Sequence, residues 1–258
     1  MADQRILFTK SGTAQYISHL DLMHTMERAF LRAGITIRHT AGFHPHPYVS
    51  IPLPLPLGFS SDCEIMEFGL VDGATMETLP QKMTDALPAG IKVLQCYEGG
   101  QAFKKLSYVR YDITLEFDAP MAPQAAEAFL ALLKRESFVV RKRSKKAKSG
   151  FTEVDVIPLV EAVEEVRADG SFLYLTLLLK AQNPGLNPDV LIQGFRGEHP
   201  EFPVVYTHCH REDPGRPKEN LSLSRKNRKP LAFGSFHYAI SVIVPINKGR
   251  FFRVSTIM

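Results

Sequence analysis

Two kinds of hydrophobic periodicity alternate along the first hundred residues, and their order constrains the fold more than any other feature. Strands have apolar side chains at every second position, whereas amphipathic helices have them at a spacing of three or four. The pattern predicts strands at residues 5–10, 35–57, 64–71 and 91–97, and helices at 18–33 and 76–87. Along the chain the order is strand, helix, strand, strand, helix, strand. This order predicts a split βαβ, ferredoxin-like domain in which two helices cover one face of a four-stranded antiparallel sheet.

The second half of the chain repeats the pattern. Apolar and polar side chains alternate strictly over residues 109–117, and an Ala-Asp-Gly turn at 168–170 separates two strand-like segments. Asn187 followed by Pro188 is typical of a helix start, because Asn caps the first turn and proline needs no hydrogen-bond partner there. A strand over 204–208 closes the second unit. The sequence therefore predicts an α+β protein with two tandem ferredoxin-like domains and antiparallel sheets.

Composition shifts place the expected domain boundaries. We expect a first domain at residues 1–97, a Gly- and Lys-containing linker at 98–107, a second domain at 108–213 and a basic tail without periodicity at 214–258.

The first helix carries clear end signals. Ser18 is a good N-cap, and Asp21 three residues later forms a variant capping box whose carboxylate faces the positive helix end. The helix therefore begins at His19, and Gly34 supplies its stop. Its buried stripe consists of Leu22, Met26, Ala29, Phe30 and Ala33.

A second face of this helix carries Asp21, His24, Arg28 and Arg32. Surface helices normally place charges opposite their core stripe, so this face has a simple interpretation as a solvated surface. The alternative is a stripe that faces an anionic ligand.

A Gly-Phe-His-Pro-His-Pro segment follows at residues 42–47. Gly42 permits a bend, and the two prolines push His44 and His46 toward extended geometry, so two imidazoles are presented on a stiff backbone. The pair is a rigid turn, a ligand contact, a metal site or a proton-transfer pair. A metal needs three or four ligands and no Cys or acidic partner lies close in sequence, so no metal site is predicted.

A basic run interrupts the second domain at residues 141–150, where we expect a mobile loop. Such runs are often only solvated, but each cation that neutralises a phosphate also adds salt-dependent affinity for nucleic acid. The expected phosphate contacts are Arg141, Lys142, Arg143, Lys145, Lys146 and Lys148.

Composition excludes several classes of protein. With 258 residues, 45% hydrophobic and 22% charged, the chain is typical of a globular protein, and no run approaches the roughly 18 apolar residues of a membrane helix. The N-terminus lacks the basic and apolar regions of an export signal, and the three cysteines form no disulfide framework or zinc motif. We expect a cytoplasmic protein without membrane attachment or cofactor. The net charge of +4 is only mildly basic, so any interaction with nucleic acid depends on local clusters.

Several motifs resemble a known family. Ser-His-Leu-Asp-Leu at 18–22, Glu-Arg-Ala at 27–29, Gly-Phe-His-Pro-His-Pro at 42–47 and Pro-Leu-Gly at 56–58 occur in the order and spacing of the radical SAM-linked protein family, and the resemblance covers roughly residues 5–97. It implies an accessory role beside a cobalamin-type radical S-adenosylmethionine (SAM) protein. The chain lacks the CxxxCxxC of a radical-generating cluster, so it is expected to be the partner and not the radical enzyme.

Three functions are consistent with these features. The first is a non-catalytic recognition module, with RNA as the expected ligand. The second is a metal-independent endoribonuclease that uses His44, His46 or His19 as general acid and base. The third is an adaptor that only docks the radical SAM protein. The expected ligand-binding residues are Lys10, Ser18, His19, Asp21, Arg28, Arg32, Gly42, Phe43, His44 and His46.

Overall fold

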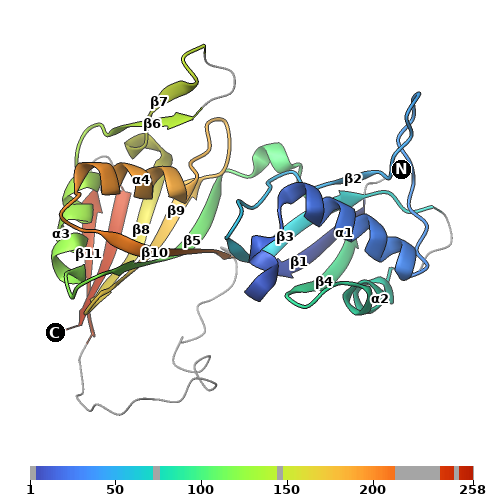
Figure 1. Cartoon of the computed structure of the whole chain (residues 1–258), viewed down its shortest axis with the longest axis horizontal. Coiled ribbons are helices and arrows are strands. Elements are labelled where there is room, and N and C mark those ends of the chain that lie inside the picture. Colours follow the sequence, from blue (N-terminus) through green and yellow to red (C-terminus); the bar gives the residue numbers. More distant parts are fainter. Residues whose placement is uncertain (1–3, 72–75, 144–147, 213–238, 247–249, 258) are drawn as a thin grey trace. The chain divides into compact units, whose positions relative to one another are not determined.

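The computed structural model describes residues 4–71, 76–143, 148–212, 239–246 and 250–257 (Figure 1). It is a mixed α+β structure whose described residues contain four α-helices and mostly antiparallel strands. The chain divides into two compact units. The first unit comprises Met1–Ser107 and His208–Glu212, and the second comprises Tyr108–Thr207 and Asp213–Met258.

The first unit is built on a three-stranded antiparallel core with strand order β3-β1-β4. The short strand β2 and the end of β10 both pair with β3, β2 antiparallel near the C-terminal end of β3 and β10 parallel near its start. The elements are β1 Gln4–Lys10, α1 His19–Arg32, β2 Val49–Ser50, β3 Ser60–Phe68, α2 Leu79–Ala86 and β4 Ile91–Glu98, with β10 at Val204–Glu212.

Helix α1 confirms the predicted capping. Its N-cap Ser18 accepts a hydrogen bond at 3.2 Å from the Asp21 amide, and Gly34 has a φ of 68°, in the left-handed region. The predicted stripe packs against the sheet, where Phe30 lies 5.0 Å from Phe68 between ring centroids. Helices α1 and α2 contact each other, and Arg32 caps the end of α2 by donating to the carbonyl of Ala86.

The predicted second strand over residues 35–57 is wrong for most of its length. Only Val49–Ser50 forms a strand, although Ile37 and His39 make single bridges to Leu70 and Pro47. From residue 45 on, the prolines explain the difference, because each lacks the N–H that a sheet ladder requires.

The second unit also places two helices on a sheet. Strand β9 pairs antiparallel with β5 and with β8, and the strand order is β11-β12-β8-β9-β5 with β10 next to β5. Phe129 of α3 and Phe195 of α4 meet at 5.4 Å in its core. The elements are β5 Tyr108–Phe117, α3 Ala122–Leu133, β6 Val139–Arg143, β7 Phe151–Asp155, β8 Val160–Asp169, β9 Phe172–Lys180, α4 Pro188–Glu198, β11 Ala239–Ile246 and β12 Arg250–Ile257.

The basic run does not form the expected loop at its start. Arg141, Lys142 and Arg143 lie on β6, which pairs with β7 in a separate two-stranded hairpin. The valine before the basic run explains why its first residues form a strand. Val140 is buried and pairs with Val154, and the pairing with β7 continues through the next three residues. Lys145 and Lys146 lie outside the described residues.

The unit boundaries differ from the predicted domains at two places. The expected linker over 98–107 belongs to the first unit, where Arg5 donates to the carbonyl of Gln101 at 2.7 Å and lies over the Phe103 ring. Residues 208–212, expected to end the second domain, also belong to the first unit. Cys63, Cys96 and Cys209 are free thiols, and none of the described helices is long and apolar enough to span a membrane.

Candidate functional site

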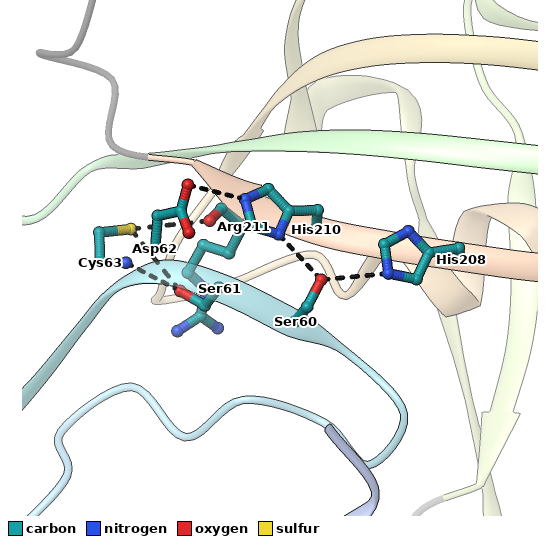
Figure 2. A network of polar contacts seen from close by, with 7 residues as sticks. All are labelled: Ser60, Ser61, Asp62, Cys63, His208, His210 and Arg211. Atoms are coloured by element: carbon teal, nitrogen blue, oxygen red, sulfur yellow. Dashed lines mark hydrogen bonds and ion pairs between the residues drawn. The ribbon is translucent and has the colours of Figure 1, made fainter. Parts of the chain in front are cut away.

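A cluster of serine, histidine and aspartate side chains lies where β10 pairs with the start of β3 (Figure 2). The Ser60 hydroxyl lies between two imidazoles, 3.1 Å from Nε2 of His208 and 2.8 Å from Nδ1 of His210. The second ring nitrogen of His210, Nε2, lies 3.3 Å from the Asp62 carboxylate. Two hydrogen bonds and one close nitrogen–oxygen contact therefore connect four polar side chains within the first unit.

The chemistry of these groups fixes the direction of the hydrogen bonds when both histidines are neutral. A carboxylate only accepts, so the neutral tautomer of His210 that this contact favours carries its proton on Nε2, facing Asp62. Nδ1 of His210 is then an acceptor, and the Ser60 hydroxyl donates to it. The Ser60 oxygen in turn accepts from Nε2–H of His208. The proton of Ser60 is thus directed at an imidazole that a carboxylate orients.

The register between β1 and β3 shifts at Asp62, which forms a bulge in β3 beside the cluster. Phe8 pairs with Glu64 and Lys10 with Ser61, so that Thr9 of β1 stands opposite two residues of β3, Asp62 and Cys63. A bulge of this kind changes the direction in which the following side chains point and is common beside functional sites.

Burial, together with the neighbouring His210, lowers the pKa of His208 below its ordinary value of 6.5. Both effects penalise the imidazolium form. His208 is therefore held as the neutral donor that the hydrogen-bond chain requires.

This shift predicts a pH-dependent stability. Because the folded pKa is lower than the unfolded one, the unfolded chain binds more protons at His208, and the contribution of His208 to the free energy of unfolding should be constant above about pH 6.5 and fall below it. Hydrogen exchange of β3 amides between pH 7.5 and 5 measures this. The His208→Gln variant should lose part of the decline, whereas His24→Gln, at an exposed histidine on α1, should keep it. An identical decline in the wild type and His208→Gln would contradict the prediction.

A buried ion pair holds the end of β10 against β3. Arg211 donates through Nη1 to Glu64 at 2.8 Å and to the carbonyl of Leu53 at 2.9 Å, and the two charged side chains are only 6% and 1% exposed. One guanidinium thus connects β10, β3 and the Leu-Pro segment. This anchor fixes the backbone next to His210.

Lys10, predicted to face a ligand, lies in the interior of the first unit. Its side chain is 1% exposed, and its ammonium donates to the carbonyls of Gln15 and Ile17, just before α1. Burial lowers the pKa of Lys10, and the negative charge of Glu64 offsets part of that effect. The lysine therefore supports the entry into α1 from within the fold.

The predicted residues of α1 are at its exposed side or its cap. Ser18 and Asp21 are engaged with each other at 2.6 Å, and His19 and Arg28 are exposed. Arg32 is exposed but bonded to α2. Of this group, His19 and Arg28 have the accessibility that a ligand contact needs.

The His-Pro-His-Pro turn connects two chain segments that backbone hydrogen bonds hold together. Backbone hydrogen bonds join Thr40 to His46 and Tyr48 to Arg38, and Gly42 has the positive φ of 131° that the bend predicted. His44 and His46 are exposed, and Phe43 is fully exposed. The turn is accessible, but it shares no described contact with the Ser60 cluster.

The basic hairpin, defined as β6 and β7 with their connection, carries the second candidate surface. The Arg141 guanidinium lies 4.2 Å from the centroid of the Phe151 ring, and Arg143 and Lys148 are exposed. An open cavity of about 330 Å³ is lined by Arg141, Ser149, Phe151, Thr152 and Glu153. One cation, an accessible aromatic ring, two hydroxyls and a carboxylate therefore meet at one concave surface.

The sequence-based prediction missed the Ser60 cluster. Ser60 and His210 are 150 residues apart, and the contact depends on the return of β10 to the first unit. One signal was present. Ser60 and Asp62, like His208 and His210, are spaced by two, which places each pair on one side of a regular strand.

No three His, Cys, Asp or Glu side chains of the described part of the chain form a group suited to hold a metal ion.

Comparisons with known proteins give a family and no activity. A family model described as "Uncharacterized protein conserved in bacteria" (DUF2344) matches residues 4–188. No curated protein matches the chain. The crystal structure of an unknown protein from Galdieria sulphuraria is similar at 12% sequence identity, covering 82% of this chain and 97% of that one, with a TM-score of 0.25.

Proposed function

The chain belongs to this uncharacterised bacterial family, and we propose that it is an accessory module that recognises RNA without itself transforming it. The observation that carries this proposal is the basic hairpin, where the Arg141 guanidinium lies over an exposed aromatic ring and Arg143 follows on the same strand. Proteins that bind single-stranded nucleic acid combine these two features, since cations follow the phosphates and aromatic rings stack on bases.

The two strands of the hairpin supply different contacts. Arg141 and Arg143 are alternate residues of β6 and both are exposed, so they offer two cations on one side of the strand. Phe151 begins β7 and is 38% exposed, which leaves part of its ring open to a base. The Arg141 guanidinium over the same ring supports a mixed stack of arginine, aromatic ring and base.

The cavity supports single-stranded RNA over a duplex. A concave surface with Ser149, Thr152 and Glu153 beside Phe151 suits an unstacked base, whose edges are free to form hydrogen bonds. A duplex keeps its bases stacked and offers mainly phosphates and sugars.

The partner in this proposal is a cobalamin-type radical SAM protein. Support comes from the motif resemblance over residues 18–58, which includes the exposed turn with Phe43, His44 and His46. We further propose a cytoplasmic location, which suits three free thiols.

We also infer that each unit is a ferredoxin-like domain. The antiparallel order β4-β1-β3 with β2 beside β3, and helices α1 and α2 in contact, support this for the first unit. The order β8-β9-β5-β10 with α3 and α4 supports it for the second.

Binding of a fluorescent single-stranded RNA to Phe151→Leu tests the proposal. Loss of a base-stacking ring should weaken binding by about 1 to 3 kcal/mol, or roughly 5- to 150-fold. Phe172→Leu is the matched control, because Phe172 is also 38% exposed but lies on β9. Equal affinity of Phe151→Leu and the wild type, or no RNA binding by the wild type, would overturn the proposal.

A further inference from the structure

We propose that Ser60 is a nucleophile activated by His210 and Asp62, and that the first unit thereby hydrolyses small carboxylic esters. This activity is separate from RNA recognition by the basic hairpin, and neither proposal depends on the other.

The first argument is the geometry of the nucleophile and its base. A general base must lie within about 2.6 to 3.2 Å of the proton that it removes, and His210 Nδ1 is 2.8 Å from the Ser60 hydroxyl. A third group has to orient the base. Asp62, 3.3 Å from the other ring nitrogen, does so and stabilises the imidazolium that forms.

The second argument is that the arrangement is held from several sides. The Arg211–Glu64 ion pair anchors the residue of β10 next to His210. Two backbone pairs, His210 with Ser60 and Arg211 with Ser61, fix the register of the two strands. Rigid support of this kind keeps a catalytic group in its reactive geometry.

The third argument is the second histidine. Nε2 of His208 lies 3.1 Å from the Ser60 oxygen, and in the tautomer derived above its N–H donates to that oxygen. This second contact fixes the position of the hydroxyl oxygen relative to His210. The cluster thus contains a nucleophile, a base, an orienting carboxylate and a second imidazole that positions the nucleophile.

The reaction is an ordinary acyl transfer to water. The Ser60 oxygen forms a bond to the carbonyl carbon while its proton moves to Nδ1 of His210. The bond from carbon to the alcohol oxygen then breaks, and His210 returns the proton to the leaving alcohol. Water repeats these steps on the acyl-serine and releases the carboxylic acid.

Exposure limits the substrate. The side chains of His210 and Asp62 are 22% and 41% exposed, so solvent reaches this side of the cluster, but Ser60 is only 5% exposed. A short, unbranched acyl group therefore fits the site better than a bulky one.

The test uses the full chain and a small alkyl fluorophosphonate, which forms an oxygen–phosphorus bond with an activated serine and releases fluoride. We expect one label per chain, mapped to Ser60 by mass spectrometry, and hydrolysis of p-nitrophenyl acetate. Ser60→Ala should abolish both, and His210→Gln should reduce the labelling rate by about 10²- to 10⁴-fold. Ser50→Ala, at a serine on β2, is the control and should label as the wild type does.

Asp62 is a positioning residue, so its test needs a second readout. Asp62→Asn should slow labelling, and Asp62→Glu, which keeps a carboxylate at this position, should restore part of the rate, because only a carboxylate stabilises the imidazolium of His210 that forms during the reaction. Circular dichroism and hydrogen exchange establish that each variant is folded. A folded wild type that takes no label at Ser60, or a label at Ser60 that persists at the same rate in folded His210→Gln, would overturn the proposal and leave the cluster as a structural link between β3 and β10.

Discussion

Replacing Arg211 by methionine should destabilise the first unit by about 3 to 5 kcal/mol. The substitution leaves the Glu64 carboxylate, 1% exposed, without the guanidinium that donates to it at 2.8 Å. A buried charge that loses its partner costs about this much, because water cannot replace the lost contact. Lys10 acts electrostatically on Glu64, which offsets part of the loss and favours the lower end of the range. Hydrogen exchange of β1 and β3 amides in increasing denaturant measures the stability of this unit.

An exposed ion pair provides the control for this experiment. Arg135 and Glu198 are as close, at 2.7 Å, but their side chains are 44% and 39% exposed, so Arg135→Met should change the stability of the second unit by less than about 1 kcal/mol. The double variant Arg211→Met/Glu64→Leu should recover much of the stability lost in Arg211→Met, since it removes the unpaired charge as well. A loss below about 1 kcal/mol in Arg211→Met would contradict the importance of this pair.

Neutralising the basic run should produce the largest effect on RNA binding. The variant replaces six cations by glutamine: Arg141, Lys142, Arg143, Lys145, Lys146 and Lys148. Each phosphate contact on single-stranded RNA contributes about 0.7 to the slope of log affinity against log salt, so each contact changes the affinity about fivefold for a tenfold change in salt. Loss of several contacts should therefore weaken binding by orders of magnitude, flatten the salt dependence, and do so about equally for all sequences.

A second variant separates a local effect from that of net charge. It replaces six cations outside the basic run by glutamine, all of them exposed: Lys82, Lys92, Lys104, Lys105, Lys134 and Arg135. The total charge changes equally, but we expect the slope to stay close to that of the wild type. Equal slopes in all three proteins would show that the basic run makes no phosphate contacts, and equal losses in both variants would assign the attraction to net charge.

The two proposed activities are separable by these variants. The six-cation variant should bind RNA poorly yet label at Ser60 at the normal rate, and Ser60→Ala should bind RNA normally. Ser60 and the basic hairpin belong to different units, so each substitution leaves the other site intact.

Local sequence by itself determined the elements whose signals are contained in a few neighbouring residues. Helix α1 begins at His19 because Ser18 caps it, and ends before Gly34 because a left-handed residue terminates it. Strands β1, β4 and β5 follow from the alternation of their side chains. The bend at Gly42 belongs to the same class. In each case, residues a few positions apart supply the whole cause.

Only the tertiary structure decided the positions that depend on distant partners. Lys10 is a strand-end lysine in the sequence, and it is buried because the carbonyls before α1 receive its ammonium. Arg141 is part of a charge run, and it lies on a strand because β7 pairs with it. Ser60 meets His210 only because β10 returns to β3 across 150 residues of sequence, and no local preference of either residue encodes that pairing. The register between two strands is set by side-chain packing over the whole sheet, so a site built across it appears only once the chain has folded.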